Sequence, residues 1–359
     1  MGNEMNEEKL LTYMENMHYD AFYVSKRENV RYISGYTGSD SSLLITKGKC
    51  YFLTDPRYTE QAALECPGYQ IVNWRTDGRT MGDKVGELLA ADKLSSLAFE
   101  AEAMSFHTYQ GFVKAVGREP IPESGVIESM RQVKTEREIA CQRAACEISC
   151  RALERLLPEI RVGVTEKELA AKLSLYMVQE GADTMPYGNI LISGARTSLL
   201  HGIPSSKAIE YGDFVLMDFG CQVDGYMSDM TRTVVVGKAD AKQREVYELE
   251  RRMVEDSLAV TRAGVTGREI YKASLKALEG TEYLPYHYGN IGHGIGLFVH
   301  EGPFSSQADT TPIPAGNVRT IEPGIYIPGW GGVRIEDQVL VTEDGYENMV
   351  RFTRELIEL

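Results

Sequence analysis

An internal repeat constrains what this chain can fold into more than any other feature of its sequence. The segment RVGVTEKEL (residues 161–169) recurs about 100 positions later as RAGVTGREI (residues 262–270). Each copy contains a Thr-x-x-Glu capping box, which is typical of a helix start, and a glycine (Gly181 or Gly280) follows where each helix should end. The repeat therefore predicts two similar halves, each with an equivalent helix.

Side chains that could bind a metal or take part in catalysis repeat with a similar spacing. The equivalent pairs are His201 and His300, Asp218 and Glu322, and Asp229 and Glu336, each about 100 positions apart. One matching nonapeptide could arise by chance. It is much less probable by chance that a helix start, a histidine and two acids all recur at nearly the same separation in the sequence. We therefore interpret each half as supplying a helix, a histidine and a carboxylate pair.

The first carboxylate pair lies in a predicted β-hairpin. In FVLMDFGCQVDGYMSDMTRTVVV (residues 214–236), apolar runs flank an Asp-Gly pair that favours a type I′ turn. With that turn, Asp218 faces Thr231, and Asp229 lies diagonally on the same face within roughly 7–8 Å. Burying two carboxylates together costs free energy, so a cation is expected beside them. Alternatives are a solvent-exposed outer face, or a bulge that changes the register.

The second carboxylate pair repeats this arrangement. Glu322 and Glu336 flank the loop PGWGG (residues 328–332), and a turn centred on Gly329 places the two acids directly opposite each other. Two exposed glutamates on one hairpin would be unremarkable as a surface feature. Two such hairpins at the repeat spacing favour a shared site instead.

A histidine between the two hairpins completes a set of possible metal ligands. His293 lies in GHGIG (residues 292–296), whose glycines allow the backbone to approach a crowded centre closely. A single histidine is more often structural than a ligand. Four carboxylates with one imidazole, however, suit two divalent ions, with Mn²⁺ favoured and Co²⁺ or Zn²⁺ as alternatives. Metal-assisted hydrolysis is the reaction class that follows from such a site.

The N-terminal part of the chain has a different character. Residues 1–125 alternate helical and strand patterns, which predicts an α/β domain over a mixed sheet and shows no cluster of metal-ligand type. Two prolines and a glycine in REPIPESG (residues 118–125) predict a boundary. We therefore expect one domain over residues 1–125 and a second over residues 126–359.

Composition excludes several classes of function. The net charge of −14 argues against nucleic acid or anionic membrane as the main partner. No apolar run approaches the roughly 18 residues of a membrane span, and the acidic start MGNEMNEEKL is unlike a secretion signal. The six cysteines form no CxxC pair or zinc-finger spacing, so we expect a reducing, cytoplasmic setting.

The motifs around the five possible ligands resemble those of a known family. MDFG, SDMTRTV, GHGIG, IEPGIY and VRIED are similar to the five-ligand signature of the pita-bread metallopeptidases, which include methionine aminopeptidase, aminopeptidase P and prolidase. NVRYISGYTGS and FLTDPRYTEQA resemble the N-terminal domain of the aminopeptidase P, prolidase and creatinase branch. Over almost the whole chain, the resemblance implies an α/β (α+β) protein: a creatinase-like N-terminal domain followed by a pseudo-twofold pita-bread catalytic domain.

The resemblance also implies roles for individual residues. Asp218 would bind one metal, His293 and Glu322 the other, and Asp229 and Glu336 would bridge both. Glu322 would also relay the proton of the bridging water, with His201 and His300 near the scissile carbonyl. Arg334 would orient Glu336 from behind.

The activity implied is that of a dinuclear-metal Xaa-Pro aminopeptidase acting on small peptides, expected as a homodimer. A prolidase-type dipeptidase is the alternative within hydrolases. A non-catalytic binding module is less favoured, because such modules usually lose ligands and all five are present. Proline-specific members commonly carry a histidine four residues before the metal-binding one. This chain has Gly289 there, with His287 and Tyr288 nearby, which weakens the proline assignment.

Overall fold

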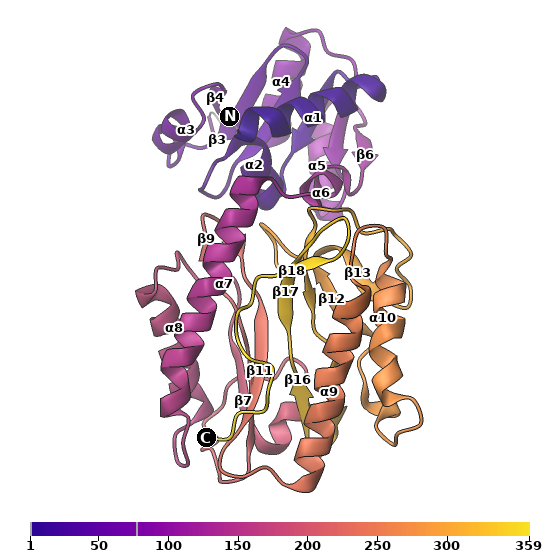
Figure 1. Cartoon of the computed structure of the whole chain (residues 1–359). Coiled ribbons are helices and arrows are strands. Elements are labelled where there is room, and N and C mark those ends of the chain that lie inside the picture. Colours follow the sequence, from indigo (N-terminus) through magenta and orange to yellow (C-terminus); the bar gives the residue numbers. More distant parts are fainter. Residues whose placement is uncertain (1, 77) are drawn as a thin grey trace. The chain divides into compact units, whose positions relative to one another are not determined.

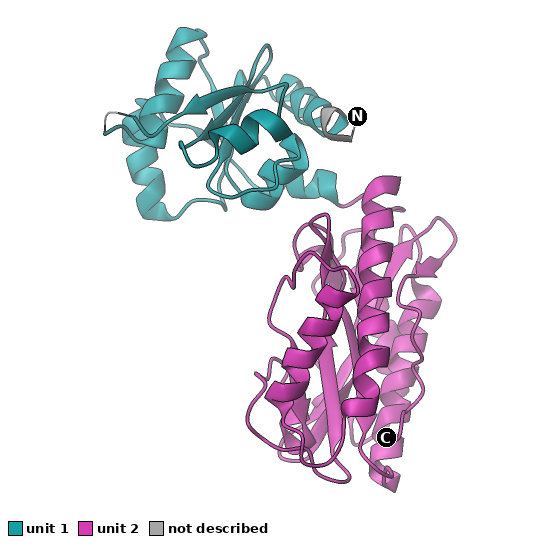
Figure 2. Cartoon of the chain, turned by 90° about the vertical axis from the view of Figure 1, so that its left-hand side faces the viewer, with its two compact units in different colours: residues 1–131 teal, residues 132–359 magenta. Residues whose placement is uncertain are grey.

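The computed structural model describes residues 2–76 and 78–359. The chain forms two compact units, residues 1–131 and 132–359 (Figure 2). The Pro/Gly-rich segment that we expected to mark the boundary is followed by α6 (Val126–Arg131). This six-residue helix packs against α1 (Gly2–Asn16) and α2 (Arg27–Ser34) and belongs to the first unit. Among the described residues, no helix has the length and apolar character needed to cross a membrane.

The first unit contains a six-stranded mixed sheet in the order β4-β3-β2-β1-β5-β6. Its strands are β1 (Ala21–Val24), β2 (Ser42–Thr46), β3 (Cys50–Thr54), β4 (Gln70–Asn73), β5 (Leu97–Glu100) and β6 (Ile121–Glu123). Its other helices are α1 (Gly2–Asn16), α2 (Arg27–Ser34), α3 (Thr59–Glu65), α4 (Met81–Ala91) and α5 (Phe106–Val116). An apolar core joins α4 and α5 to the sheet, as the alternating pattern predicted.

The second unit consists of two halves that repeat a helix pair and a sheet. The first half has α7 (Glu136–Leu156), α8 (Glu166–Gln179), β7 (Ile190–Ser193), β8 (Phe214–Phe219) and β11 (Met230–Val235), with the short strands β9 (Gln222–Val223) and β10 (Tyr226–Met227). The second half has α9 (Ala241–Val260), α10 (Gly267–Leu275), β12 (Asn290–Gly294), β13 (Glu301–Ser306), β14 (Val318–Ile321), β15 (Gly324–Ile327), β16 (Gly331–Arg334), β17 (Asp337–Val341) and β18 (Tyr346–Asn348). Figure 1 shows α7 beside α8 and α9 beside α10. The resulting fold is a creatinase-like N-terminal domain with a pita-bread catalytic domain.

Each half of the second unit has its own apolar core. One core includes Leu153 of α7 and Met217 of β8, and the other includes Met253 of α9 and Ile321 of β14. Sheet orders are β11-β8-β7 in the first half and β13-β12-β14-β17-β18 in the second. The two cores place the two acid-bearing hairpins between the helix pairs.

Equivalent hydrogen bonds confirm the repeat at the level of individual atoms. Both α8 and α10 begin with a complete threonine capping box. The turn before each helix is fixed by matching backbone bonds of 2.9 Å, from Gly163 N to Ile209 O and from Gly264 N to Ile313 O. The helix starts expected from the sequence are therefore correct in both copies.

The predicted hairpin registers are confirmed as well. Asp224 and Gly225 both have positive φ angles, 49° and 81°, and Thr231 pairs with Asp218. In the second half, the pairs Ile321–Asp337 and Gly324–Arg334 flank the two glutamates, so the register is centred on Gly329 as expected.

Candidate active site and metal centre

The first acid pair points into the protein rather than toward solvent. Asp218 lies on β8 and Asp229 directly before β11, and their side chains are 13% and 7% exposed. The guanidinium of Arg334, at the end of β16, pairs with Asp218. The hydroxyl of Tyr187 donates to Asp229. Charge and hydrogen bonds from distant parts of the chain therefore hold these two carboxylates in a buried site.

The second half adds an imidazole and a carboxylate that contact each other. His293 on β12 places Nε2 3.1 Å from Glu322 Oε1 and 3.8 Å from Asp229 Oδ2. Its Nδ1 lies 3.0 Å from the Gly294 carbonyl, which can only accept, so Nδ1 donates. Burial alone would lower the pKa of His293, but the hydrogen bond and charge of Glu322 raise it, so Nε2 also carries a proton and donates to Glu322. A metal bound at Nε2 would replace that proton.

Glycine beside His293 is required by close packing. A Cβ atom at Gly292 would lie 2.2 Å from the Thr320 carbonyl oxygen, and the φ angle there is 153°. The sheet backbone therefore approaches the centre more closely than any side chain at this position would allow. The close approach inferred from the GHGIG motif is confirmed.

Three of the five expected ligands form a compact cluster of metal-ligand type. One ligand atom from each of Asp229, His293 and Glu336 lies within 4.8 Å of the other two, and all three residues are buried. Glu322 joins them through its contact with His293. Asp218 lies at the side of the cluster, next to Arg334.

The buried acids of this cluster must either be protonated or lie beside a cation. Burial raises the pKa of Asp229 and Glu336 well above the usual range, and their own neighbouring carboxylates add to the effect. Glu336 Oε2 accepts a hydrogen bond from Thr231 Oγ1 at 2.7 Å. Glu336 Oε1 is buried and has no hydrogen-bond partner among the described residues. A divalent cation would satisfy this oxygen and stabilise the ionised acids, so the residues fit a metal.

Glu322 differs from the other acids. Burial alone would raise its pKa, but the hydrogen bond and charge of His293 together bring the pKa of Glu322 below its usual value. Its Oε1 also accepts from Thr320 Oγ1 at 3.0 Å. Glu322 is therefore ionised at neutral pH and can accept a proton.

The two repeated histidines lie on the exposed side of the site. His201 and His300 are both exposed, and the His300 ring is 4.5 Å from the His293 ring in an edge-on arrangement. Burial, followed by the charge of His293, lowers the pKa of His300, and His201 contributes to the same effect. Both imidazoles therefore lie where a substrate could reach them.

Arg334 has a different direct partner from the one expected. We expected it to orient Glu336, but its guanidinium pairs with Asp218 and donates from Nε to Thr231 Oγ1 at 3.1 Å. Thr231 in turn donates to Glu336, so Arg334 acts on that carboxylate only indirectly. Sequence reasoning missed Thr231, although its position two residues after Asp229 places it on the same strand face. Tyr187 was also missed, and no sequence pattern indicates it.

The neighbourhood of Gly289 does not supply a replacement histidine. Gly289 is exposed, and a Cβ atom there would meet no other atom within 4 Å. His287 donates from Nδ1 to the Leu284 carbonyl at 2.6 Å, and its Nε2 is 2.8 Å from the Tyr271 hydroxyl. Both ring nitrogens of His287 thus serve local structure.

Comparisons with known proteins agree with this architecture. Residues 7–133 match the creatinase/prolidase N-terminal domain, and residues 140–343 match metallopeptidase family M24. An Xaa-Pro dipeptidase of Pyrococcus furiosus is 35% identical, over 98% of this chain and 99% of its own length.

Solved structures of the same kind superpose closely. An Xaa-Pro dipeptidase from Bacillus anthracis has a TM-score of 0.94 at 36% identity, covering 99% of this chain and 100% of its own. An X-Pro aminopeptidase from Thermotoga maritima has a TM-score of 0.92 at 34% identity, covering 98% and 99%. The buried acid and histidine cluster, the repeat and these matches lead to one conclusion: the chain belongs to metallopeptidase family M24, and it is a peptide hydrolase with a creatinase/prolidase N-terminal domain.

Proposed function

We propose that this chain is a dinuclear-metal Xaa-Pro aminopeptidase, which removes the N-terminal residue from peptides with proline in second position. The observation that carries the proposal is the buried cluster of Asp229, His293 and Glu336, in which one Glu336 oxygen lacks a partner among the described residues. The relatives named for Xaa-Pro peptidases support the proline preference.

The five ligands are assigned according to what surrounds each of them. Asp218 would bind one ion, His293 and Glu322 would bind the other, and Asp229 and Glu336 would bridge the two. Burial and neighbouring carboxylates raise the pKa of both Asp229 and Glu336, so a cation close to each would be needed to keep it ionised, which supports assigning both as bridging ligands. We expect Mn²⁺, with Co²⁺ or Zn²⁺ as alternatives.

When bound, such a metal pair lowers the pKa of a water molecule and polarises the scissile carbonyl. The chain's own residues then handle the proton and the substrate. Glu322 would accept the proton of the attacking water and pass it to the leaving nitrogen of proline. His201 and His300, on the exposed side, would donate hydrogen bonds to the oxygen of the scissile carbonyl, which becomes negative in the tetrahedral intermediate.

A prolidase-type dipeptidase is an equally supported second candidate. Several relatives, including the Bacillus anthracis and Pyrococcus furiosus proteins, carry the name Xaa-Pro dipeptidase. Gly289, where proline-specific members commonly have a histidine, bears on how strict the proline requirement is. The two candidates share the bond that is cleaved and differ in the length of peptide accepted.

Three matched peptides test the proposal after loading with Mn²⁺ or Co²⁺: Ala-Pro, Ala-Pro-Ala and Ala-Ala-Ala. Cleavage of Ala-Pro-Ala without Ala-Pro supports the aminopeptidase. Cleavage of Ala-Pro alone supports the dipeptidase. Equal cleavage of Ala-Ala-Ala would contradict the proline preference. No cleavage of any peptide by metal-loaded protein would contradict the substrate class.

Two further properties belong to the same proposal. We expect a homodimer, from the family resemblance, and sedimentation at micromolar concentration should give twice the mass of 40.1 kDa. We also expect a reducing, cytoplasmic setting, from the spacing of the six cysteines in the sequence. Fractionation of the native cells checks that location.

A further inference from the structure

The two histidines on the exposed side of the site are carried by loops of very different length. His300 lies between β12 and β13, in residues 295–300, so paired strands fix both ends of its short loop. His201 lies between β7 and β8, in residues 194–213. A connection of that length has many conformations available to it unless other contacts restrain it. His201 therefore needs supports that the pairing of β7 with β8 does not supply.

One buried carboxylate accepts hydrogen bonds from both ends of the segment that carries His201. Glu166, the first residue of α8, is 0% exposed. Its Oε1 accepts from the Ser193 backbone nitrogen at 2.8 Å and from the Ser193 hydroxyl at 3.0 Å. Its Oε2 accepts from the backbone nitrogen and the hydroxyl of Ser205, at 2.8 and 2.7 Å. Glu166 therefore joins the two ends of residues 193–205.

An arginine within the loop binds the same carboxylate. Arg196 Nε lies 3.2 Å from both Glu166 oxygens, and its Nη2 donates to the Ile203 carbonyl at 2.7 Å. Arg196 thus connects the carboxylate to the backbone two residues beyond the histidine. Burial alone would raise the pKa of Glu166, but the hydrogen bonds from Ser205 and Ser193 lower it below its usual value. Hydrogen bonds to an ionised acceptor are stronger than neutral ones.

The inner side of the loop contacts residues that support the metal centre. The Leu200 carbonyl accepts from Arg334 Nη1 at 3.4 Å, and Thr197 Oγ1 accepts from the Gly332 nitrogen at 2.8 Å. Gly202 is buried, and a Cβ atom there would lie 2.8 Å from a side chain of β7. The residues on both sides of the histidine therefore have fixed neighbours.

The second half has no carboxylate at the equivalent position, and close packing explains why. The repeat aligns Glu166 with Gly267, where a Cβ atom would lie 1.8 Å from the Phe304 carbonyl oxygen. The backbone of β13 therefore fills the space that a side chain would need. His300, on its short loop, is supported by the strands instead, so the requirement for a carboxylate is particular to the longer loop.

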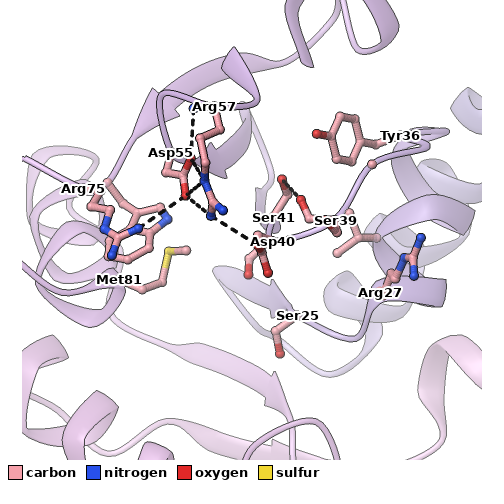
Figure 3. A pocket seen from close by; sticks show the side chains of 14 residues that line it. Ser25, Arg27, Tyr36, Ser39, Asp40, Ser41, Asp55, Arg57, Arg75 and Met81 are labelled. Carbon is pink, nitrogen blue, oxygen red and sulfur yellow. Dashed lines mark hydrogen bonds and ion pairs between the residues drawn. The ribbon is translucent and has the colours of Figure 1, made fainter. Parts of the chain in front are cut away.

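A buried carboxylate of the first unit shows how much distance in sequence matters. Asp55, whose side chain is 3% exposed, accepts from the Arg57 backbone nitrogen at 2.9 Å and from Arg57 Nη2 at 2.6 Å (Figure 3). Those donors lie two positions away, so these bonds shape a single turn. The serine donors to Glu166 lie 27 and 39 positions away, so Glu166 fixes the path of a loop.

We propose that Glu166 is a positioning residue for the peptidase reaction, which holds residues 193–205 so that His201 stays beside the substrate carbonyl. This inference rests on the proposed role of His201 in hydrolysis. Glu166 is buried and acts through His201, so its removal should lower turnover while leaving the metal content unchanged. Three residues act with it as one unit: Ser193, Arg196 and Ser205.

Turnover of the Glu166→Gln protein is the first test. Glutamine keeps the size of the side chain but turns an amide donor toward other donors, so it cannot satisfy both ends of the loop. We expect kcat for an Xaa-Pro peptide to fall at least tenfold, with little change in KM and the same metal content. Glu168→Gln, two residues along the same helix, keeps an acceptor for the Thr165 capping box and should leave kcat unchanged.

A double-mutant cycle separates positioning from a general loss of structure. If Glu166 acts through His201, Glu166→Gln should change kcat less than twofold in the His201→Ala background. An equal loss of kcat in both backgrounds would show that Glu166 does not act through His201, and would overturn the proposal.

Hydrogen exchange follows the loop independently of turnover. Amides of residues 193–205 should exchange at least tenfold faster in Glu166→Gln than in the unsubstituted protein, and those of residues 295–300 should not change. Unchanged exchange in the folded variant would overturn the inference, whichever peptide is cleaved. If the exchange result is as expected but the metal-loaded unsubstituted protein cleaves no peptide, the proposed function alone is contradicted. If circular dichroism shows Glu166→Gln to be unfolded, Ser205→Ala, which removes one hydroxyl donor, takes its place in the same tests.

Discussion

The two halves of the catalytic unit place their acids at equivalent positions but support them differently. In the first half, Asp218 pairs with a guanidinium and Asp229 accepts from a tyrosine hydroxyl. In the second half, Glu322 contacts an imidazole, and the Glu336 carboxylate accepts one hydrogen bond from the described residues, from Thr231. Repeated backbone geometry therefore does not imply repeated chemistry.

The difference separates the acids into two classes. Asp229 and Glu336, equivalent in the repeat, both have a pKa raised well above the usual range, chiefly by burial. Asp218 and Glu322 are also equivalent, yet burial raises the pKa of Asp218 while His293 lowers that of Glu322 against the effect of burial. Asp229 and Glu336, whose pKa values are shifted in the same direction, suit bridging ligands. In the pair whose pKa values are shifted in opposite directions, Glu322 suits a ligand that also transfers protons.

Removing one acid from each class should produce the largest effect and the clearest contrast. Asp229→Ala should lose both ions, because a bridging ligand serves each, and kcat/KM should fall by at least about a thousandfold, or about 4 kcal/mol. Asp218→Asn keeps an oxygen for Arg334 and should retain one ion. Metal analysis of dialysed protein gives the counts. Two ions retained by Asp229→Ala would rule out bridging.

The proton-transfer role of Glu322 predicts a loss confined to turnover. Glu322→Gln keeps the size and one ligand oxygen but cannot accept a proton, so kcat should fall by about a hundredfold or more. KM and the unfolding transition should change little. The equivalent change in the other half, Asp218→Asn, should affect metal content more than proton transfer. An unchanged kcat in Glu322→Gln would remove the proposed relay.

Arg334 connects the two halves, and its replacement should have an intermediate effect. It pairs with Asp218 and, through Thr231, supports Glu336. Arg334→Lys keeps the charge but cannot make these bonds together, so metal affinity and kcat/KM should fall about tenfold to a hundredfold. Thr231→Ser keeps the bridging hydroxyl and serves as the control. Equal metal affinity in Arg334→Lys and the unsubstituted protein would show that the link is unimportant.

The sequence predicted the parts of the site that depend on local pattern. Hairpin register follows from the Asp-Gly turn and from alternation along each strand, so Asp218 was correctly placed opposite Thr231. The supporting contacts could not be predicted, because they join residues far apart in the chain. Tyr187 meets Asp229 across 42 positions, and Arg334 meets Asp218 across 116. The first contact depends on how the segment before β7 packs within its half and the second on how the two halves pack, and no local pattern encodes either.

The raised pKa of Asp229 and Glu336 predicts a pH dependence that metal should reverse. In metal-free folded protein, Asp229 and Glu336 stay protonated at pH values above about 4, which is the pKa of a carboxyl group in the unfolded chain. Their stabilising contribution is therefore present at low pH and lost as pH rises from about 4 through the folded pKa. Metal displaces these protons, so its affinity should rise up to tenfold per pH unit for each proton released, about 1.4 kcal/mol.

Thermal unfolding with and without metal between pH 5 and pH 8 measures this effect. The difference in Tm between Mn²⁺-loaded and chelator-treated protein should widen as pH rises. Glu336→Gln has no proton to lose at that position and should flatten the dependence. A difference in Tm that stays constant across this range would contradict the raised pKa values and the need for a neutralising cation.

Replacing Tyr187 should have the smallest effect of these changes. The test is specific to the first half, because no tyrosine has the equivalent role among the described contacts of the second half. Its hydroxyl donates to Asp229 Oδ1, on the side away from His293. Tyr187→Phe removes one hydrogen bond without charge, so kcat/KM should fall by no more than about tenfold. Tyr176→Phe, which removes a hydroxyl bonded to Glu159 on the outer helix, is the matched control. If Tyr187→Phe behaves like Tyr176→Phe, the metal alone fixes Asp229. If it weakens metal binding, the asymmetric support of the two halves is itself part of how the site holds its ions.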